Sequence, residues 1–237
     1  MTAGTLYLIP CPISDQTDPW NVLPAANRAV MDALDYFIVE NTRTARRFLS
    51  KAGVARPIEE LEFRELNEHT VAGREVEELV APLLAGRSAG VISEAGVPGV
   101  ADPGALVVET CHRRGIRVVP LVGPSSIILA MMASGLNGQS FAFNGYLPVK
   151  PPERLRAIRF FERRARSEGQ SQLFIEAPYR NGKLLEQLVR TLAPETRLTV
   201  AADLTAPAER IETRTVGEWR RMALPELNKR PAIFIIG

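Results

Sequence analysis

The sequence has few of the residues from which metal centres and disulfide frameworks are built. Its 237 residues include only two cysteines, Cys11 and Cys111, and two histidines, too few for a multi-cysteine zinc site or a set of disulfides. No run of about 18 apolar residues occurs, and the amino-terminal MTAGTLYLIP lacks the basic region that begins a secretory signal. We therefore expect a soluble, cytoplasmic protein that has no metal site and does not enter a membrane.

A strong net charge and a dinucleotide-binding glycine motif are also missing. The formal net charge is only +2 at pH 7, which by itself does not indicate a nucleic-acid-binding protein. No G-x-G-x-x-G pattern follows the first expected strand, which disfavours a dehydrogenase. The remaining composition, with 46% hydrophobic and 24% charged residues, is ordinary for a globular protein, and the length suits one or two domains.

Strand-like and helix-like segments alternate along both halves of the chain. Short apolar runs of strand length are found at 4–10, 36–39, 89–93, 116–121, 138–147, 172–176, 198–203, 211–216 and 231–236. Segments with helical spacing lie between most of them, including a single helix over 21–34 with Pro24 in its first turn. This pattern predicts an α/β fold with two α/β domains, residues 1–122 and 123–237, and a ligand cleft between them.

The stretch from Gly86 to Gly104 contains the most distinctive loop. An apolar strand, Ala89 to Ser93, enters a loop of interspersed glycines and prolines, and a helix from Ala105 to Gly115 follows. Proline fixes φ whereas glycine allows positive φ, so this loop is expected to hold one shape. Ligands of open parallel sheets bind at the carboxyl ends of strands, where the loop lies. The alternative is a loop that only reverses the chain.

Polar residues also follow the second strand and precede a later helix. Glu40 and Arg43 come directly after the strand at 36–39, while Glu68 and His69 precede a helix that is expected from about Val71. A carboxylate or an imidazole in a cleft is a candidate acid or base. The alternatives are an acid and a solvated cation at a helix start, and a histidine that caps a helix or lies on the surface.

Arginine is concentrated in one expected helix of the second half. Pro148 to Pro152 is the segment most typical of a linker, and a helix from Glu153 to Arg166 follows it. The arginines of this helix are Arg154, Arg156, Arg159, Arg163, Arg164 and Arg166. Because clustered guanidinium groups suit phosphate, the helix indicates either a footprint for an anionic substrate or a solvated face.

Six motifs occur in order over nearly the whole chain: GTLYLIP, SEAGVPGVADPG, VVPLVGPSS, NGYLP, FIEAPYR and AIFIIG. Together they resemble the tetrapyrrole-methylase superfamily of S-adenosylmethionine-dependent methyltransferases. The resemblance is greatest to the branch that contains the ribosomal small subunit methyltransferases I, which methylate a cytidine ribose 2′-hydroxyl in 16S rRNA. It implies two α/β domains, a homodimer, and the methyl donor S-adenosyl-L-methionine bound in the cleft between the domains.

The resemblance also implies which residues bind the donor. It places Pro10 near the donor, and around the methionine part of the donor it places Ala95, Gly96, Val97, Asp102 and Pro103. Beside the donor it also places Pro124, Ser125 and Ser126. Near the adenine it places Glu176, Ala202, Asp203, Leu204, Pro231, Ala232 and Ile233. Either serine after Pro124 is equally suited to cap the helix that follows.

Methyl transfer from a sulfonium requires that donor and acceptor are aligned. Charged residues would bind the donor, activate the acceptor and hold the RNA. Carboxylates such as Glu94 or Asp102 would hold the positive sulfonium. A ribose hydroxyl is a poor nucleophile, and the candidates for a base that activates it are Glu40, Glu68 and His69. Arg43 and the arginine-rich helix would hold RNA phosphates.

Several positions depart from the pattern of the ribosomal branch. Cys11 to Asp18 stands where that branch has T-P-I-G-N-L-x-D, Glu40 to Arg43 reads E-N-T-R in place of E-D-T-R, and Ala206 stands where the branch has a lysine. The small carboxyl-terminal extension of the branch does not follow Gly237. These differences leave the methyl acceptor open. The alternatives to RNA are a small molecule such as a tetrapyrrole, or no acceptor at all in a non-catalytic homodimer that binds the donor.

Overall fold

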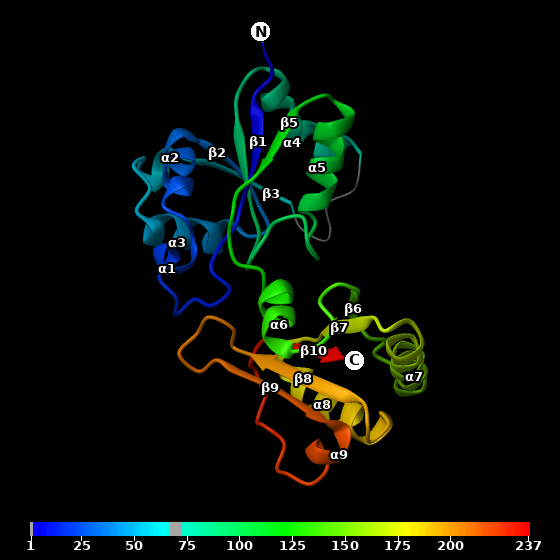
Figure 1. Ribbon diagram of the computed structural model, residues 1–237. Coiled ribbons are helices and arrows are strands. Elements are labelled where there is room, and N and C mark those ends of the chain that lie inside the picture. Colours follow the sequence, from blue (N-terminus) through cyan, green and yellow to red (C-terminus); the bar gives the residue numbers. More distant parts are fainter. Residues whose placement is uncertain (1, 67–72) are drawn as a thin grey trace. The chain divides into compact units, whose positions relative to one another are not determined.

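The computed structural model describes residues 2–66 and 73–237 (Figure 1). The chain divides into two compact units, an N-terminal unit that ends at Ser125 and a C-terminal unit that begins at Ser126. Each unit is built on one five-stranded sheet with helices packed on both faces, which confirms the α/β class. None of the described helices is long and apolar enough to span a membrane.

The sheet of the N-terminal unit is wholly parallel, with the strand order β3-β2-β4-β1-β5. Its strands are β1 (Thr5–Ile9), β2 (Tyr36–Val39), β3 (Glu62–Glu65), β4 (Ala89–Ile92) and β5 (Arg117–Pro120). Because the strands run in one direction, the loops that follow them leave from the same edge of the sheet. β2 and β4 are buried along their whole length, as is usual at the centre of a parallel sheet.

Helices cover both faces of this sheet. They are α1 (Pro19–Val22), α2 (Ala26–Ala33), α3 (Thr42–Ala52), α4 (Arg74–Leu84) and α5 (Gly104–Arg113), with a short 3₁₀ turn η1 (Ile58–Glu60). α2 and α3 share one core cluster, and α4 and α5 share the other. The prediction of one helix over 21–34 is wrong, because Leu23 has an extended ψ of 133° that ends α1. Pro24 disfavours a helical conformation at the residue before it, so it separates α1 from α2.

The sheet of the C-terminal unit is mixed, with the order β6-β7-β10-β8-β9. Only β6 and β7 pair in parallel. The strands are β6 (Phe141–Tyr146), β7 (Ser171–Ile175), β8 (Arg197–Ala202), β9 (Arg210–Thr215) and β10 (Ala232–Ile236). The helices are α6 (Ser126–Ser134), α7 (Pro151–Glu168), α8 (Asn181–Thr191) and α9 (Val216–Trp219), with a 3₁₀ turn η2 (Pro178–Arg180). α6 packs on one face of the sheet, while α7, α8 and α9 pack on the other.

The segment from Pro148 to Pro152 is not a linker between compact units. It lies inside the C-terminal unit, where it connects β6 to α7. Pro151 and Pro152 form the first turn of α7, a position that suits proline because the first N–H groups of a helix have no intrahelical partner. The prediction of a linker here is therefore wrong.

Candidate functional site

Three loops of the N-terminal unit meet where β1, β4 and β5 end. The N–H of Cys11 donates to the carbonyl of Gly96 at 2.9 Å, and the N–H of Gly96 donates back at 3.2 Å. A Cβ on Gly123 would come within 2.3 Å of the Cβ of Pro10, and a Cβ on Gly96 would lie 3.4 Å from the carbonyl oxygen of Pro124. The structure thus brings together three of the predicted donor residues, Pro10, Gly96 and Pro124.

Asp102 fixes the shape of the glycine-proline loop. The N–H of Gly99 donates to both of its carboxylate oxygens, at 2.9 and 3.0 Å, and the N–H of Gly104 donates at 2.7 Å. Gly96 and Gly99 have φ values of +73° and +82°, a region that glycine enters without steric cost. Burial raises the pKa of Asp102, while the two backbone hydrogen bonds act in the opposite direction. The prediction of a loop with a fixed shape is consistent with these contacts.

Glu40 and Glu94 lie beside this loop. The N–H of Glu94 donates to Oε1 of Glu40 at 3.3 Å, and the hydroxyl of Thr44 donates to Oε1 of Glu94 at 2.5 Å. The pKa of Glu40 is raised, mainly by burial and then by the negative charge of Asp102. Within residues 2–66 and 73–237, no Lys or Arg forms an ion pair with Glu40, Glu94 or Asp102. We call these three residues the carboxylate cluster.

The carboxylate cluster does not have the ligands of a usual metal site, and the nearby thiol of Cys11 connects two loops. No group of three or more His, Cys, Asp or Glu side chains in the described part of the chain is placed to hold a metal ion. The thiol of Cys11 donates to the carbonyl of Ser93 at 2.9 Å. Burial raises the pKa of this thiol to about 12, so it stays protonated and holds the loop after β4 against the loop after β1.

The remaining predicted residues of this unit differ in their placement. Arg43 is exposed in the first turn of α3, where its N–H donates to the side chain of Asn41 at 2.9 Å. Pro103 immediately precedes α5, and Ala95 is exposed. Glu68 and His69 lie outside the described residues. Their predicted part as a base therefore remains a prediction.

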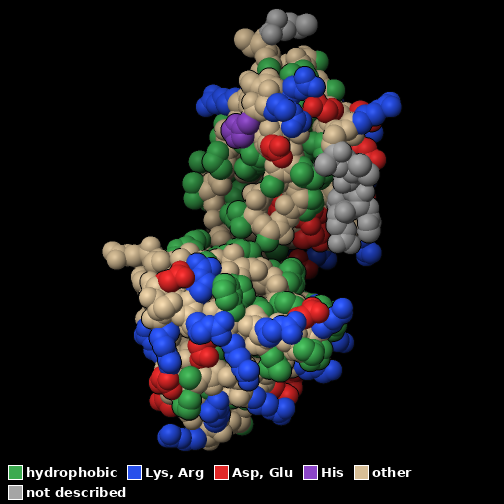
Figure 2. Space-filling view, turned by 90° about the vertical axis from the view of Figure 1, so that its right-hand side faces the viewer, with side chains coloured by type: hydrophobic (Ala, Val, Ile, Leu, Met, Phe, Trp, Pro, Cys, Tyr) green, Lys and Arg blue, Asp and Glu red, His purple; other side chains and the backbone are tan. Residues whose placement is uncertain are grey.

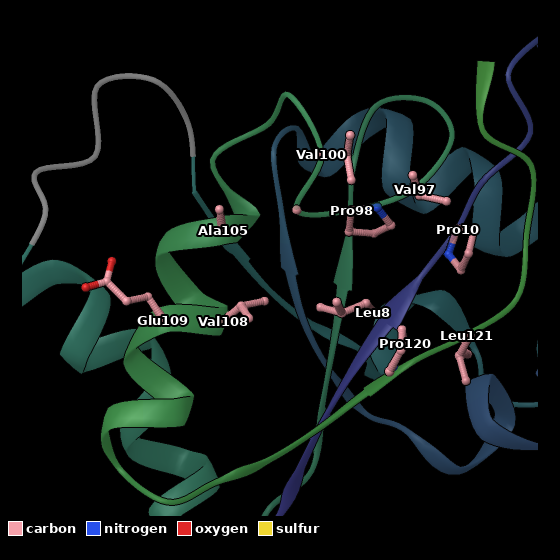
Figure 3. Close-up of a pocket in the computed structure, with 11 residues that line it drawn as sticks. Leu8, Pro10, Val97, Pro98, Val100, Ala105, Val108, Glu109, Pro120 and Leu121 are labelled. Atoms are coloured by element: carbon pink, nitrogen blue, oxygen red, sulfur yellow. The ribbon is translucent and has the colours of Figure 1, made fainter. Parts of the chain in front are cut away.

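A cavity of about 510 Å³ lies beneath the glycine-proline loop, between β1, β5 and α5. Its walls are Leu8, Pro10, Val97, Pro98, Gly99, Val100, Ala105, Val108, Glu109, Pro120 and Leu121. Leu8 and Val108 point toward one another across it (Figure 3). Pro10 and Val97 were predicted to contact the donor, whereas the aliphatic walls were not. The sequence signals those walls only as apolar positions of strands and a helix.

The predicted adenine-side residues lie together at one end of the C-terminal sheet. Ala202 pairs with Ala232 across β8 and β10, and the N–H of Asp203 donates to the carbonyl of Pro231 at 3.0 Å. Asp203 has a positive φ of 50° and forms a 2.5 Å ion pair with Arg230. The side chains of Leu204 and Ile233 are buried in the α6 cluster. This strand end therefore offers mainly backbone N–H and C=O groups to a ligand.

Glu176 follows β7 at the same end, but its carboxylate is fully engaged. Its side chain is 1% exposed and accepts hydrogen bonds from Arg180 at 2.6 and 2.9 Å, from Arg154 at 3.2 Å and from the N–H of Ala177 at 2.8 Å. Arg154 also donates to the carbonyl of Pro148 at 2.7 Å. Glu176 thus ties α7 and η2 to the end of β7.

The six arginines of α7 separate into two groups. Arg154 is buried against Glu176, Arg164 pairs with Glu168, and Arg166 pairs with Glu195. The other three are exposed and form no ion pair among the described residues: Arg156, Arg159 and Arg163. α7 lies at the right of Figure 1, on the side that Figure 2 turns toward the viewer, and Lys and Arg side chains are spread over that face of the C-terminal unit. Their spacing of three and four residues places the unpaired arginines on one helix face.

The N-terminal unit fits the cationic donor that the motifs imply. S-adenosyl-L-methionine carries positive sulfonium and ammonium groups, and the carboxylate cluster supplies negative charge that no described Lys or Arg neutralises. A Cβ on Gly99 would meet nothing within 4 Å, so the loop leaves open space beside its backbone. A ligand is able to approach the main chain closely at such a position.

Comparison of the sequence with known proteins shows the family to which the chain belongs. A family model described as Tetrapyrrole (Corrin/Porphyrin) Methylases matches residues 18–219. The chain is 31% identical over 235 residues to the ribosomal RNA small subunit methyltransferase I of Xylella fastidiosa, covering 99% of this chain and 81% of that protein. The protein of the same name from Escherichia coli O157:H7 is 31% identical over 233 residues, covering 98% and 77%.

Two solved structures share the fold. The methyltransferase CobJ superposes with a TM-score of 0.65 at 17% identity, covering 99% of this chain and 94% of that chain. The uroporphyrin-III-C-methyltransferase of Thermus thermophilus superposes with a TM-score of 0.56 at 20% identity, covering 99% and 92%. At these identities the likeness concerns the arrangement of strands and helices.

Proposed function

Because this chain belongs to the tetrapyrrole methylase family and is an S-adenosylmethionine-dependent methyltransferase, we propose that its acceptor is RNA of the small ribosomal subunit. The proposed reaction is transfer of the methyl group to a ribose 2′-hydroxyl of 16S rRNA, on a cytidine or a related position. The observation that carries this proposal is the 31% identity over 99% of the chain to a ribosomal RNA small subunit methyltransferase I.

The unpaired arginines of α7 support an RNA acceptor. Arg156, Arg159 and Arg163 present three guanidinium groups to solvent on one helix face. The acidic residues of this helix have other partners: Glu153 pairs with Lys150 at 3.9 Å, Glu162 accepts hydrogen bonds from Ala193 and Thr196, and Glu168 pairs with Arg164. A run of unneutralised arginines binds the regularly spaced phosphates of a nucleic acid. A neutral acceptor would form no ion pairs with these arginines.

We assign the donor to the loops of the N-terminal unit. The bound donor would supply an electrophilic methyl group on a positive sulfur, and Glu94 and Asp102 of the carboxylate cluster would hold that positive charge. The close approach of Pro10 to Gly123, and of Gly96 to Cys11 and Pro124, gives the loops a fixed shape before binding, which aligns donor and acceptor. In the C-terminal unit, the backbones of 202–204 and 231–233 are the groups proposed to receive the adenine.

Glu40 is the described residue that best fits the part of general base. Burial and the nearby charge of Asp102 raise its pKa, which makes its carboxylate a better proton acceptor than an exposed glutamate. Only one of its oxygens has a described partner, the N–H of Glu94. Glu40 would take the proton from the ribose hydroxyl as the oxygen attacks the methyl carbon, and Arg43 would hold a neighbouring phosphate.

A homodimer is also proposed, because the family resemblance implies one. Light scattering of the purified protein at several concentrations tests this point separately from catalysis, and a monomer at all concentrations would contradict it. A ribosomal acceptor further places the enzyme in the cytoplasm.

The acceptor is tested by transfer of a tritiated methyl group from S-adenosylmethionine. The purified protein is incubated with 30S subunits that lack ribose methylation, with bulk tRNA, and with an extract of tetrapyrroles. The proposal expects label in 16S rRNA, in a nucleotide whose 3′-linkage resists alkaline hydrolysis because its 2′-oxygen is blocked. Label confined to small molecules, or donor binding without any transfer, would contradict it.

A further inference from the structure

Two tyrosines stand exposed beside an anchored arginine at the end of β6 and β7. The side chains of Tyr146 and Tyr179 are 63% and 65% exposed, although aromatic side chains gain most from burial. The guanidinium carbon of Arg180 lies 5.2 Å from the centre of the Tyr179 ring, a cation–π distance. We call these three residues the aromatic cluster.

The fold holds each member of the aromatic cluster in place. Phe143 pairs with Leu173 and Tyr146 with Ile175, so β6 carries one extra residue between these two pairs. Gly145, at a φ of +63°, accommodates this bulge. A bulge of this type re-aims the side chain that follows it, here Tyr146. The exposure of this ring is therefore set by the strand itself.

Arg180 is held on the other side of the aromatic cluster. Its guanidinium donates two hydrogen bonds to Glu176, whose other oxygen accepts from Arg154. Its pKa is raised, first by these hydrogen bonds to Glu176 and then by the negative charge of the same carboxylate. A fixed, charged guanidinium plane therefore stands against the Tyr179 ring. Tyr146 pairs with Ile175, the residue before Glu176, and both rings remain open to solvent.

This combination of groups suits one kind of partner. Unpaired RNA bases stack on exposed aromatic rings and on guanidinium planes, whereas paired bases hide their faces in the duplex. The aromatic cluster lies at the end of β7, where Ile175 pairs with Ile233 of β10 and Glu176 follows. The adenine of the donor is proposed to bind at this same end of the sheet. We propose that Tyr146, Tyr179 and Arg180 form a stacking site for unpaired bases of the RNA acceptor. This inference rests on the proposed RNA function.

Replacement of each tyrosine by alanine tests the stacking site. The full-length Tyr146→Ala and Tyr179→Ala variants are titrated into a fluorescein-labelled, cytidine-rich single-stranded RNA and into the same strand annealed to its complement. Loss of one stacked base is expected to weaken single-strand binding by about 5- to 150-fold. Duplex binding should change little, and the salt dependence should keep its slope because tyrosine carries no charge.

Matched variants separate a lost ring from general damage. Tyr146→Phe and Tyr179→Phe keep the stacking surface and are expected to restore most of the lost affinity. Met132→Ala removes an apolar side chain of α6 that is 74% exposed, more than either tyrosine, and should leave RNA binding as in the wild type. Thermal unfolding of each variant checks the fold.

Three outcomes distinguish this inference from the function on which it rests. If the wild type methylates 16S rRNA but the alanine variants bind single strands as well as it does, the stacking site is wrong and the proposed function stands. If the alanine variants lose affinity for S-adenosylmethionine instead, the rings serve the donor and the inference is overturned. If the wild type neither binds nor methylates RNA, the proposed function itself fails.

Discussion

The acidic groups at the strand ends of the two units have opposite surroundings. In the C-terminal unit, Glu176 is enclosed by two arginines and a backbone N–H. In the N-terminal unit, Glu40, Glu94 and Asp102 accept hydrogen bonds from backbone and hydroxyl groups, and no described Lys or Arg pairs with them. A carboxylate with its own cations stabilises the fold, whereas a cluster without them is suited to a cationic ligand. The two sets of carboxylates therefore differ in the charges that surround them, while the family resemblance implies donor contacts for members of both.

The largest expected effect follows from removing the enclosed carboxylate. Glu176→Ala leaves Arg154, whose side chain is 8% exposed, buried without its partner. Breaking a buried pair in this way typically costs about 3–5 kcal/mol of unfolding free energy. Urea denaturation of a Trp20→Phe background, in which the remaining fluorescence comes from Trp219 in the C-terminal core, measures this loss.

An exposed ion pair provides the control for that experiment. Glu195→Gln disrupts the ion pair with Arg166. The side chains of Glu195 and Arg166 are 65% and 61% exposed, so the loss of unfolding free energy should be less than about 1 kcal/mol. Equal losses for Glu176→Ala and Glu195→Gln would mean that the arginine enclosure does not stabilise the unit.

Charge reversal on α7 is expected to have a smaller but specific effect on RNA. The Arg159→Glu/Arg163→Glu double variant should bind RNA more weakly and lower the log–log salt slope by about 1.4, which corresponds to two lost contacts with phosphates of a single strand. Its affinity for S-adenosylmethionine should not change. Electrophoretic mobility shifts at a series of salt concentrations give the slope.

The paired arginine of the same helix is the matched comparison. Arg164→Gln removes one charge that Glu168 already neutralises, so its salt slope should stay close to that of the wild type. RNA affinity that is unchanged in the double variant would contradict the assignment of this face to phosphate.

The smallest expected effect is on the pH dependence of protein stability, through Glu40 of the carboxylate cluster. Because the pKa of Glu40 is raised in the folded state above its ordinary value of 4.5, ionisation of Glu40 opposes folding. Its contribution to stability is full below pH 4.5 and is lost as the pH rises through the folded-state pKa. Glu40→Gln should therefore melt at a higher temperature than the wild type at pH 7.5, with a difference that disappears toward pH 4. A lower melting temperature of the variant at pH 7.5 would contradict this account.

The alternation of apolar runs and helical spacing predicts most of the fold. Buried strands such as β4 and β10 have the continuous apolar sequences that a central strand requires. β3 escaped prediction because its sequence, EFRE, is acidic, and it becomes a strand through its pairing with β2 at the edge of the sheet. The break at Pro24 was missed because a proline is compatible with a first turn as well as with a helix end.

The candidate site was predictable in part. The glycines and prolines of the donor loop mark a fixed shape, and that signal is local in sequence. The partition of the α7 arginines is local only for Arg164, which pairs with Glu168 four residues along the helix. For Arg154 and Arg166 it depends on Glu176 and Glu195, which reach the helix only through the fold. The aromatic cluster depends in part on the pairing of β6 with β7, which creates the bulge before Tyr146, whereas its ion pair between Glu176 and Arg180 spans only four residues.

The most direct test of the contrast between the two units is a calorimetric titration of S-adenosylmethionine into the wild type and into the Glu94→Gln/Asp102→Asn variant. Both replacements keep an oxygen that accepts hydrogen bonds but remove the negative charge. Glu60→Gln, at an exposed position of η1, is the control and should bind like the wild type. The account predicts that the double variant binds the donor about 10- to 100-fold more weakly. Equal donor affinity in the double variant and the wild type would contradict the claim that unpaired carboxylates of the N-terminal unit hold the positive charge of the donor.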